Sequence, residues 1–312
     1  MIERVAGAVF RAFWVALLVA VPFLLLPLGL GDATALVVLL AFLAGLMTFL
    51  EYSTEFPSVL EFRDAAPFNR MRFAAVFLVV VVLALILRAE VYPSQLGLLL
   101  QALGRLLGQW ADFPYSPVRL ALLALPADAP QALIDHVRVA AAVDYSLAGG
   151  VLLVFLAVVR FSGWPMRGGA FNVWVNLPMF DPTKGDVLLR LQRDARINVM
   201  LGFILPFLIP AVLKGLSGWI DLNVLMNPHV LIWSMMIWAC LPANMILRGV
   251  AIGRVAEMID EKRRRTYAEA KLAEVIPAKH VEVTKLIDEC RVLGAALDLA
   301  DLVLKTLPAH HP

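Results

Sequence analysis

The connection at residues 51–72 holds the carboxylates whose spacing best suits chemistry. Its acidic residues are Glu51, Glu55, Glu61 and Asp64, and its arginines are Arg63, Arg70 and Arg72. Glu51 and Glu55 lie four residues apart, so on a helix they would share a face and could bind a cation or exchange protons with a substrate. The neighbouring arginines favour solvated ion pairs instead, each contributing about 0–1 kcal/mol. We therefore expect solvated, interfacial carboxylates with a structural role.

The rest of the sequence lacks the common constellations of catalytic or metal-binding residues. It contains no HExxH motif, no Walker-type phosphate loop, no GxSxG elbow and no CxxC pair. Its two cysteines, Cys240 and Cys290, are far apart, and its five histidines are scattered. The sequence thus predicts no catalytic residue, no cofactor and no metal site.

Composition indicates the surroundings of the chain. Hydrophobic residues make up 61 % of its 312 residues and charged residues 17 %, with a mean hydropathy of +0.81. These values are typical of an integral membrane protein rather than a soluble domain. A net charge of +2 gives no reason to expect a nucleic-acid partner. Membrane lipids are the expected surroundings.

Six stretches are apolar enough to cross a bilayer, which takes roughly 20 helical residues for about 30 Å of hydrocarbon. They are Phe13–Leu30, Ala35–Leu50, Phe73–Leu87, Ala140–Val159, Val199–Ile220 and Val230–Leu247. Only a helix satisfies every backbone N–H and C=O within one such span. The predicted fold class is an all-α integral membrane protein: a six-transmembrane-helix bundle with interfacial amphipathic helices and a helical cytoplasmic tail. We predict a transmembrane domain at 1–248 and the tail at 249–312.

The distribution of basic residues predicts the orientation. The 51–72 and 160–198 connections are rich in Lys and Arg, whereas 31–34 and 221–229 contain neither. By the positive-inside rule, both termini are then cytoplasmic. The lack of a recognisable eukaryotic targeting signal favours a prokaryotic, bacterial inner membrane. Cleavage of the first span as a signal peptide is an alternative, although its apolar run exceeds the usual length of about 7–15 residues.

The expected spans carry no ionisable side chain near their middles. Asp144 and Lys214 lie near the expected outer ends of the fourth and fifth spans, so we expect Asp144 to keep contact with water and Lys214 to reach the headgroups. Charged groups deep in the hydrocarbon usually mark ion, proton or substrate routes. The sequence therefore lacks the usual signature of a pump or a coupled transporter.

The segment 88–139, on the expected periplasmic side, is too apolar for an ordinary loop. Leucines recur at helical spacing over residues 96–107, and a second leucine group follows at 120–125. Asp128 is placed to cap a third short helix that leads into the fourth span. We expect these helices to cap the bundle at the outer interface, and a docking surface or lid for a partner is the alternative.

Two basic clusters are predicted to meet the inner membrane surface. One follows Asp186, a suitable N-cap, on a helix whose opposite face carries Leu191 and Ala195. The other lies early in the tail. The predicted membrane-surface residues are Arg190, Arg193, Arg196, Lys262, Arg263, Arg264 and Arg265.

The tail contains an apolar seam that recurs at steps of three and four residues. Its members are Val283, Leu286, Cys290, Leu293, Leu297, Ala300 and Leu304. About three heptads are near the minimum for a coiled coil, and further apolar residues beside the seam favour packing against another helix. We predict that these residues bind a membrane-protein partner or a second copy of the chain.

Three functions remain open at this stage. The leading hypothesis is a non-enzymatic scaffold, assembly or accessory component of a membrane complex, because docking surfaces are present and catalytic motifs are absent. A transporter or channel for an apolar or zwitterionic solute would need no charge inside the membrane. A lipid-active enzyme at the cytoplasmic face would use the 51–72 carboxylates.

Overall fold

The computed structural model describes residues 2–26, 33–55, 58–63, 65–165, 177–178, 180–181 and 185–306, without the side chains at 2, 33, 274–281, 283 and 300–306. Over these residues the chain is all-helical and has no strand. It forms two compact units, Met1–Ala256 (unit 1) and Glu257–Pro312 (unit 2).

Six helices within the described ranges are long and apolar enough to cross a membrane, which confirms that part of the sequence prediction. They are α1 (Ile2–Leu25), α2 (Ala33–Ser53), α3 (Phe68–Val91), α6 (Gln131–Phe161), α8 (Val187–Gly215) and α9 (Pro228–Thr306). The last of them, α9, contributes residues to both units and continues as a helix through Pro277. Six apolar helices of this length indicate a membrane location.

The core of unit 1 lies between α3, α6 and the first part of α9. Val79, Val80 and Leu83 of α3 are fully or almost fully buried, as are Leu133 of α6 and Ile232 of α9. Buried side chains recur at three- and four-residue steps within each of these helices, so each helix turns one apolar face inward. These three helices are the frame on which the other elements pack.

The α1–α2 hairpin is the least buried part of unit 1. In each of these two helices, 17 % of the residues in the 18-residue apolar stretch are buried, whereas 44 % are buried in the corresponding stretch of α3. The two helices pack closely on each other where a Cβ at Gly45 would lie 3.3 Å from the Ala12 carbonyl oxygen. The hairpin reaches the core chiefly through α1, where the Trp14 and Phe77 rings meet edge to face with centroids 5.6 Å apart.

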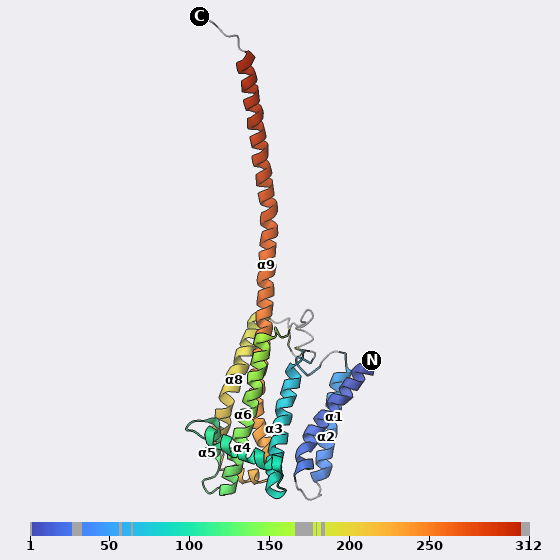
Figure 1. Cartoon of the computed structure of the whole chain (residues 1–312), viewed down its shortest axis with the longest axis vertical. Helices are drawn as coiled ribbons and strands as arrows, with labels where there is room; N and C mark the ends of the chain where they lie inside the picture. Colours follow the sequence, from blue (N-terminus) through green and yellow to red (C-terminus); the bar gives the residue numbers. More distant parts are fainter. Residues whose placement is uncertain are drawn as a thin grey trace. The chain divides into compact units, whose positions relative to one another are not determined.

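Two shorter helices, α4 (Gln95–Ala111) and α5 (Pro117–Ala124), lie across the end of unit 1 opposite the start of α1 (Figure 1). Their N-caps are Ser94, which accepts a hydrogen bond from the Gly97 amide, and Ser116, which accepts one from the Arg119 amide. A short 3₁₀ helix, η1 (Leu222–Met226), precedes α9 at the same end. We call this end of unit 1 the α4–α5 end, and the other the N-terminal end.

The prediction of a third short helix capped by Asp128 is wrong. Helix α6 begins at Gln131, with Pro130 in the N-cap position, and runs without a break to Phe161. Buried side chains such as Leu133 and Val137 continue the inward face of the span toward its N-terminus, so one helix forms instead of two.

Helices α8 and α9 approach each other closely at two glycines. A Cβ on Gly202 would lie 2.5 Å from the Pro242 carbonyl oxygen, and a Cβ on Gly249 would lie 2.7 Å from the Ala195 carbonyl oxygen. Small residues allow this approach, which is common between helices in membranes.

We predict that Gly202→Ala lowers the free energy of unfolding in detergent by about 1–3 kcal/mol, because the added methyl overlaps α9. Gly150→Ala is the control, since a Cβ there meets nothing within 4 Å. Alanine is also the better helix former, so the control should be neutral or slightly stabilising. Equal unfolding temperatures for the two variants would show that α8 and α9 are farther apart at Gly202 than a 2.5 Å approach of a Cβ to the Pro242 carbonyl oxygen requires.

Candidate functional site

Asp144 is a carboxyl group enclosed in the core of unit 1. Its side chain has 0 % exposure, and neither carboxylate oxygen has a hydrogen-bond partner among the described residues. The expectation that Asp144 keeps contact with water is wrong. Helix α6 begins nine residues before the predicted span, which places Asp144 deep inside the helix rather than near its end.

The surroundings of Asp144 are apolar. Cys240 of α9 is buried and lies near Asp144. The ring of the adjacent Tyr145 packs at a tilt on the Trp238 ring, with centroids 6.0 Å apart. Burying a polar group without a hydrogen-bond partner is costly, and burying a charge without a partner costs far more. An ionisable residue kept in such a place within an apolar bundle is a candidate functional group.

A polar cavity opens one helical turn from Asp144. It has a volume of about 510 Å³ between α3, α4 and α6, and its lining includes Ala140. At its rim, His136 and Glu90 are 2.8 Å apart, and Gln101 donates a hydrogen bond to the Ile86 carbonyl oxygen. His136, Ala140 and Asp144 follow one another at four-residue steps, so they share one side of α6. The buried carboxyl is thus separated from a polar cavity by a single turn, about 6 Å of helix.

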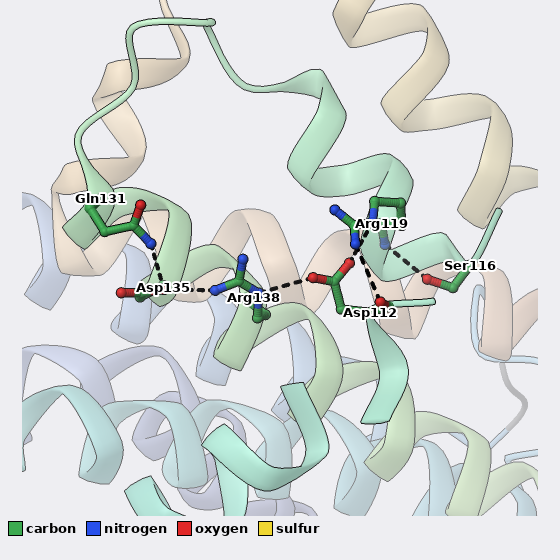
Figure 2. Close-up of polar contacts among 6 residues, drawn as sticks. All are labelled: Asp112, Ser116, Arg119, Gln131, Asp135 and Arg138. Atoms are coloured by element: carbon green, nitrogen blue, oxygen red, sulfur yellow. Dashed lines mark hydrogen bonds and ion pairs between the residues drawn. The ribbon is translucent and has the colours of Figure 1, made fainter. Parts of the chain in front are cut away.

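A network of charges fastens the α4–α5 end to α6. Figure 2 shows Asp112, which follows α4, between Arg119 of α5 at 2.8 Å and Arg138 of α6 at 3.1 Å. Arg138 also pairs with Asp135 at 2.7 Å, and Gln131 donates to the same carboxylate. Each charge here has a partner of opposite sign on another element or turn. The geometry suits a cap that holds the crossing helices in place.

At the N-terminal end, Glu51 is an internal acceptor rather than a solvated charge. Its side chain is 8 % exposed, and Oε1 accepts hydrogen bonds from the backbone amides of Ser58, Val59 and Leu60 at 2.9–3.0 Å. The Ser58 hydroxyl donates to the other oxygen. The expectation of a solvated Glu51 is therefore wrong, because the chain after α2 folds back over the carboxylate.

The other carboxylates of this connection have separate surroundings. Glu61 makes a two-pronged ion pair with Arg248 of α9 at 2.6 and 2.8 Å, and Glu55 is exposed. Asp64 lies outside the described residues. Glu51 and Glu61 thus have different partners and do not form one acid–base pair. Among the described residues, no three His, Cys, Asp or Glu side chains lie together as metal ligands.

An aromatic cluster under this connection was not found from the sequence. Phe62 and Phe68 pack with Phe155 of α6 and Trp164, at centroid distances of 4.8 to 6.1 Å. All four side chains are buried, and the Trp164 indole N–H donates to the Ala65 carbonyl oxygen. The cluster holds the 51–72 connection against α6 and Trp164. In the sequence, the only indication of this cluster is the number of aromatic residues in these segments.

The predicted basic face lies on α8, where exposed Leu189 and Ile197 stand beside the arginines. Asp186 caps the helix by accepting from the Leu188 amide at 2.8 Å, Leu191 is buried, and Arg193 and Arg196 are exposed. Arg190 lies 4.5 Å from the Phe180 ring centroid. In unit 2, residues 262–265 are all exposed. Their role at a membrane surface stays a prediction.

The apolar seam of the tail lies on helix α9 within unit 2. Leu286, Leu293 and Leu297 are 55–68 % exposed, and Cys290 is exposed too. The side chains of the remaining seam residues, Val283, Ala300 and Leu304, lie outside the described part of the chain.

No protein-family model, curated protein or solved structure matches this chain. The fold and the sites define its class: an all-helical chain with six helices long and apolar enough to cross a membrane, and a buried carboxyl group among them.

Replacing Glu51 should weaken the fold of the connection. In Glu51→Gln, an uncharged amide faces three backbone N–H donors, so we expect a loss of about 1–3 kcal/mol in stability and faster proteolysis within 54–65. Glu55→Gln, at an exposed position, is the matched control and should behave as wild type. Unchanged protection in Glu51→Gln would contradict the structural role assigned to this carboxylate.

Proposed function

We propose that this chain is a multi-pass protein of a bacterial inner membrane, with both termini in the cytoplasm, and that it acts as a non-enzymatic scaffold, assembly or accessory component of a membrane complex. The exposed faces of its long helices support a membrane setting, since Phe10, Phe42, Leu153 and Phe203 are each 62–68 % exposed. The alternation of basic and non-basic connections supports the orientation.

The observation that carries the scaffold function is the apolar surface of the tail. Besides Leu286, Leu293 and Leu297, the neighbouring Ile287 and Val292 are 60 % and 70 % exposed. Each large aliphatic side chain left in water forgoes about 1.5–3 kcal/mol of burial. Several of them along one helix, beyond the apolar spans, are best explained by a second helix that covers them. The cover is a tail from another copy, in a coiled coil, or a helix of a membrane-protein partner.

The double variant Leu286→Asp, Leu293→Asp tests this assignment. Two charges in the seam should not disturb insertion or accumulation, but they should remove a bound subunit or convert an oligomer to a monomer. Native mass spectrometry of the detergent-solubilised chain, before and after crosslinking, measures the change.

A charge-matched control is Arg291→Ala, Ala295→Asp, which alters the net charge equally on the opposite side of the helix. The control should keep the assembly of the wild type. Identical assemblies in wild type, double variant and control would show that the seam is not an assembly surface.

Transport is a second candidate function, and Asp144 is the observation that favours it. The sequence offered a transporter only for an apolar or zwitterionic solute, because no buried charge was expected. A buried carboxyl one turn from a polar cavity is instead suited to take up and release a proton during a transport cycle. The lipid-active enzyme has less support, because Glu51 and Glu61 are held by structural partners.

Proton uptake into liposomes distinguishes the transport function. With the chain reconstituted and a potassium diffusion potential applied, a pH-sensitive dye should report uptake that Asp144→Asn reduces at least tenfold. Asp128→Asn, which removes an exposed carboxylate that does not line the polar cavity, should retain the wild-type rate. Equal rates in wild type and Asp144→Asn would exclude this role of the carboxyl group.

A further inference from the structure

A large groove at the N-terminal end combines an apolar wall with a basic rim. It has a volume of about 790 Å³ between the α1–α2 hairpin and α3, and Asn244 of α9 also lines it. Trp14 and Leu18 of α1 and Phe73 and Val76 of α3 are part of the apolar wall. The hairpin touches the core chiefly through α1, so the groove follows the open seam between these elements.

Three arginines line the groove: Arg11, Arg70 and Arg72. No Asp or Glu is among the described residues that line it. Three positive charges without a facing carboxylate give the groove a local positive field. The occupant that complements this field is an anion.

The hydrogen bonds of these arginines leave their charges unneutralised. Arg72 donates to the amide oxygens of Asn244 at 3.2 Å and Asn69 at 3.4 Å, both of which are neutral. Arg11 donates to the Gly7 carbonyl oxygen and stacks 4.6 Å from the Tyr52 ring centroid.

Glu61 lies within electrostatic range of Arg72, but both of its oxygens bind Arg248. Arg70 is exposed at the groove. The groove therefore presents two guanidinium groups oriented by neutral partners, and a third, that of Arg70, which is exposed and has no partner among the residues that the structure describes.

We propose that this groove binds an anionic phospholipid of the membrane leaflet at the N-terminal end, with its phosphate at Arg11, Arg70 and Arg72 and an acyl chain along Trp14, Leu18, Phe73 and Val76. Guanidinium groups bind phosphate oxygens through charge-assisted, often two-pronged hydrogen bonds. In the proposed orientation this end faces the cytoplasm, where the leaflet is rich in anionic lipid. A zwitterionic lipid fits less well because its ammonium group would face three arginines. The site is independent of the tail and of Asp144.

Native mass spectrometry with added lipid tests the site in the full-length chain. Phosphatidylglycerol should remain bound at a collision energy that removes phosphatidylcholine. The Arg70→Gln, Arg72→Gln double variant should bind phosphatidylglycerol about tenfold more weakly. Arg105→Gln, Arg160→Gln removes two exposed arginines that do not line the groove, and this variant should bind it as wild type does.

Two further measurements keep the test independent of folding. Arg70→Gln alone removes only an exposed side chain, and it should lose several-fold in lipid affinity at an unchanged unfolding temperature without lipid. Val15→Trp, at a groove-lining position, should exclude the acyl chain and weaken binding with all three arginines present.

Three results would overturn the proposal: equal retention of the two lipids, equal affinity of the two double variants, or displacement of the lipid by millimolar inorganic phosphate alone. The last would show that the groove holds a small anion and that the apolar wall contributes nothing.

Discussion

The long helices of unit 1 expose many large apolar side chains, and this constraint governs the rest of the structure. Side chains such as Phe42, Leu153 and Phe203 are exposed on helices whose backbone groups are paired within each helix. In surroundings without water, an unpaired backbone group costs several kcal/mol, so long unbroken helices are the available solution. Irregular backbone is then confined to the two ends, where polar side chains can satisfy it. The contrast between apolar sides and polar ends decides where each charged residue lies.

The charged residues at the two ends follow this rule, and Asp144 breaks it. At the N-terminal end, Glu51 accepts hydrogen bonds from the chain that follows α2, and Glu61 pairs with Arg248 of α9. At the α4–α5 end, Asp112 pairs with Arg138 of α6. Satisfied groups of this kind define one arrangement of the connections and add rigidity. Asp144 has no such partner among the described residues, so its burial lowers the stability of the fold and no hydrogen bond compensates for it. Among the carboxylates that the structure describes in unit 1, it is therefore the one whose presence calls for a functional explanation.

Much of the helical framework could be read from the sequence, but the sites could not. Hydropathy located the six long helices, and leucine spacing located α4 and α5, because both patterns are local. The burial of Asp144 was missed because hydropathy marks the most apolar part of a helix and not its first turn, which in α6 lies at Gln131. The role of Glu51 depends on a backbone reversal seven to nine residues later, and Arg72 meets an amide 172 residues away. Such pairings follow from the tertiary fold, which no single window of sequence contains.

The groove between the hairpin and α3 also has a consequence for biosynthesis. Helices α1 and α2 pack on each other and precede α9 in the chain, so they are synthesised before Asn244 of α9, which lines the groove and accepts a hydrogen bond from Arg72. Until α9 inserts, Arg72 lacks this partner and the groove lacks one of its polar lining residues. Completion of the groove is therefore a late event in the insertion of the chain. A chain truncated before α9 would keep its hairpin and its arginines while leaving this surface unfinished and open to the quality-control machinery of the membrane.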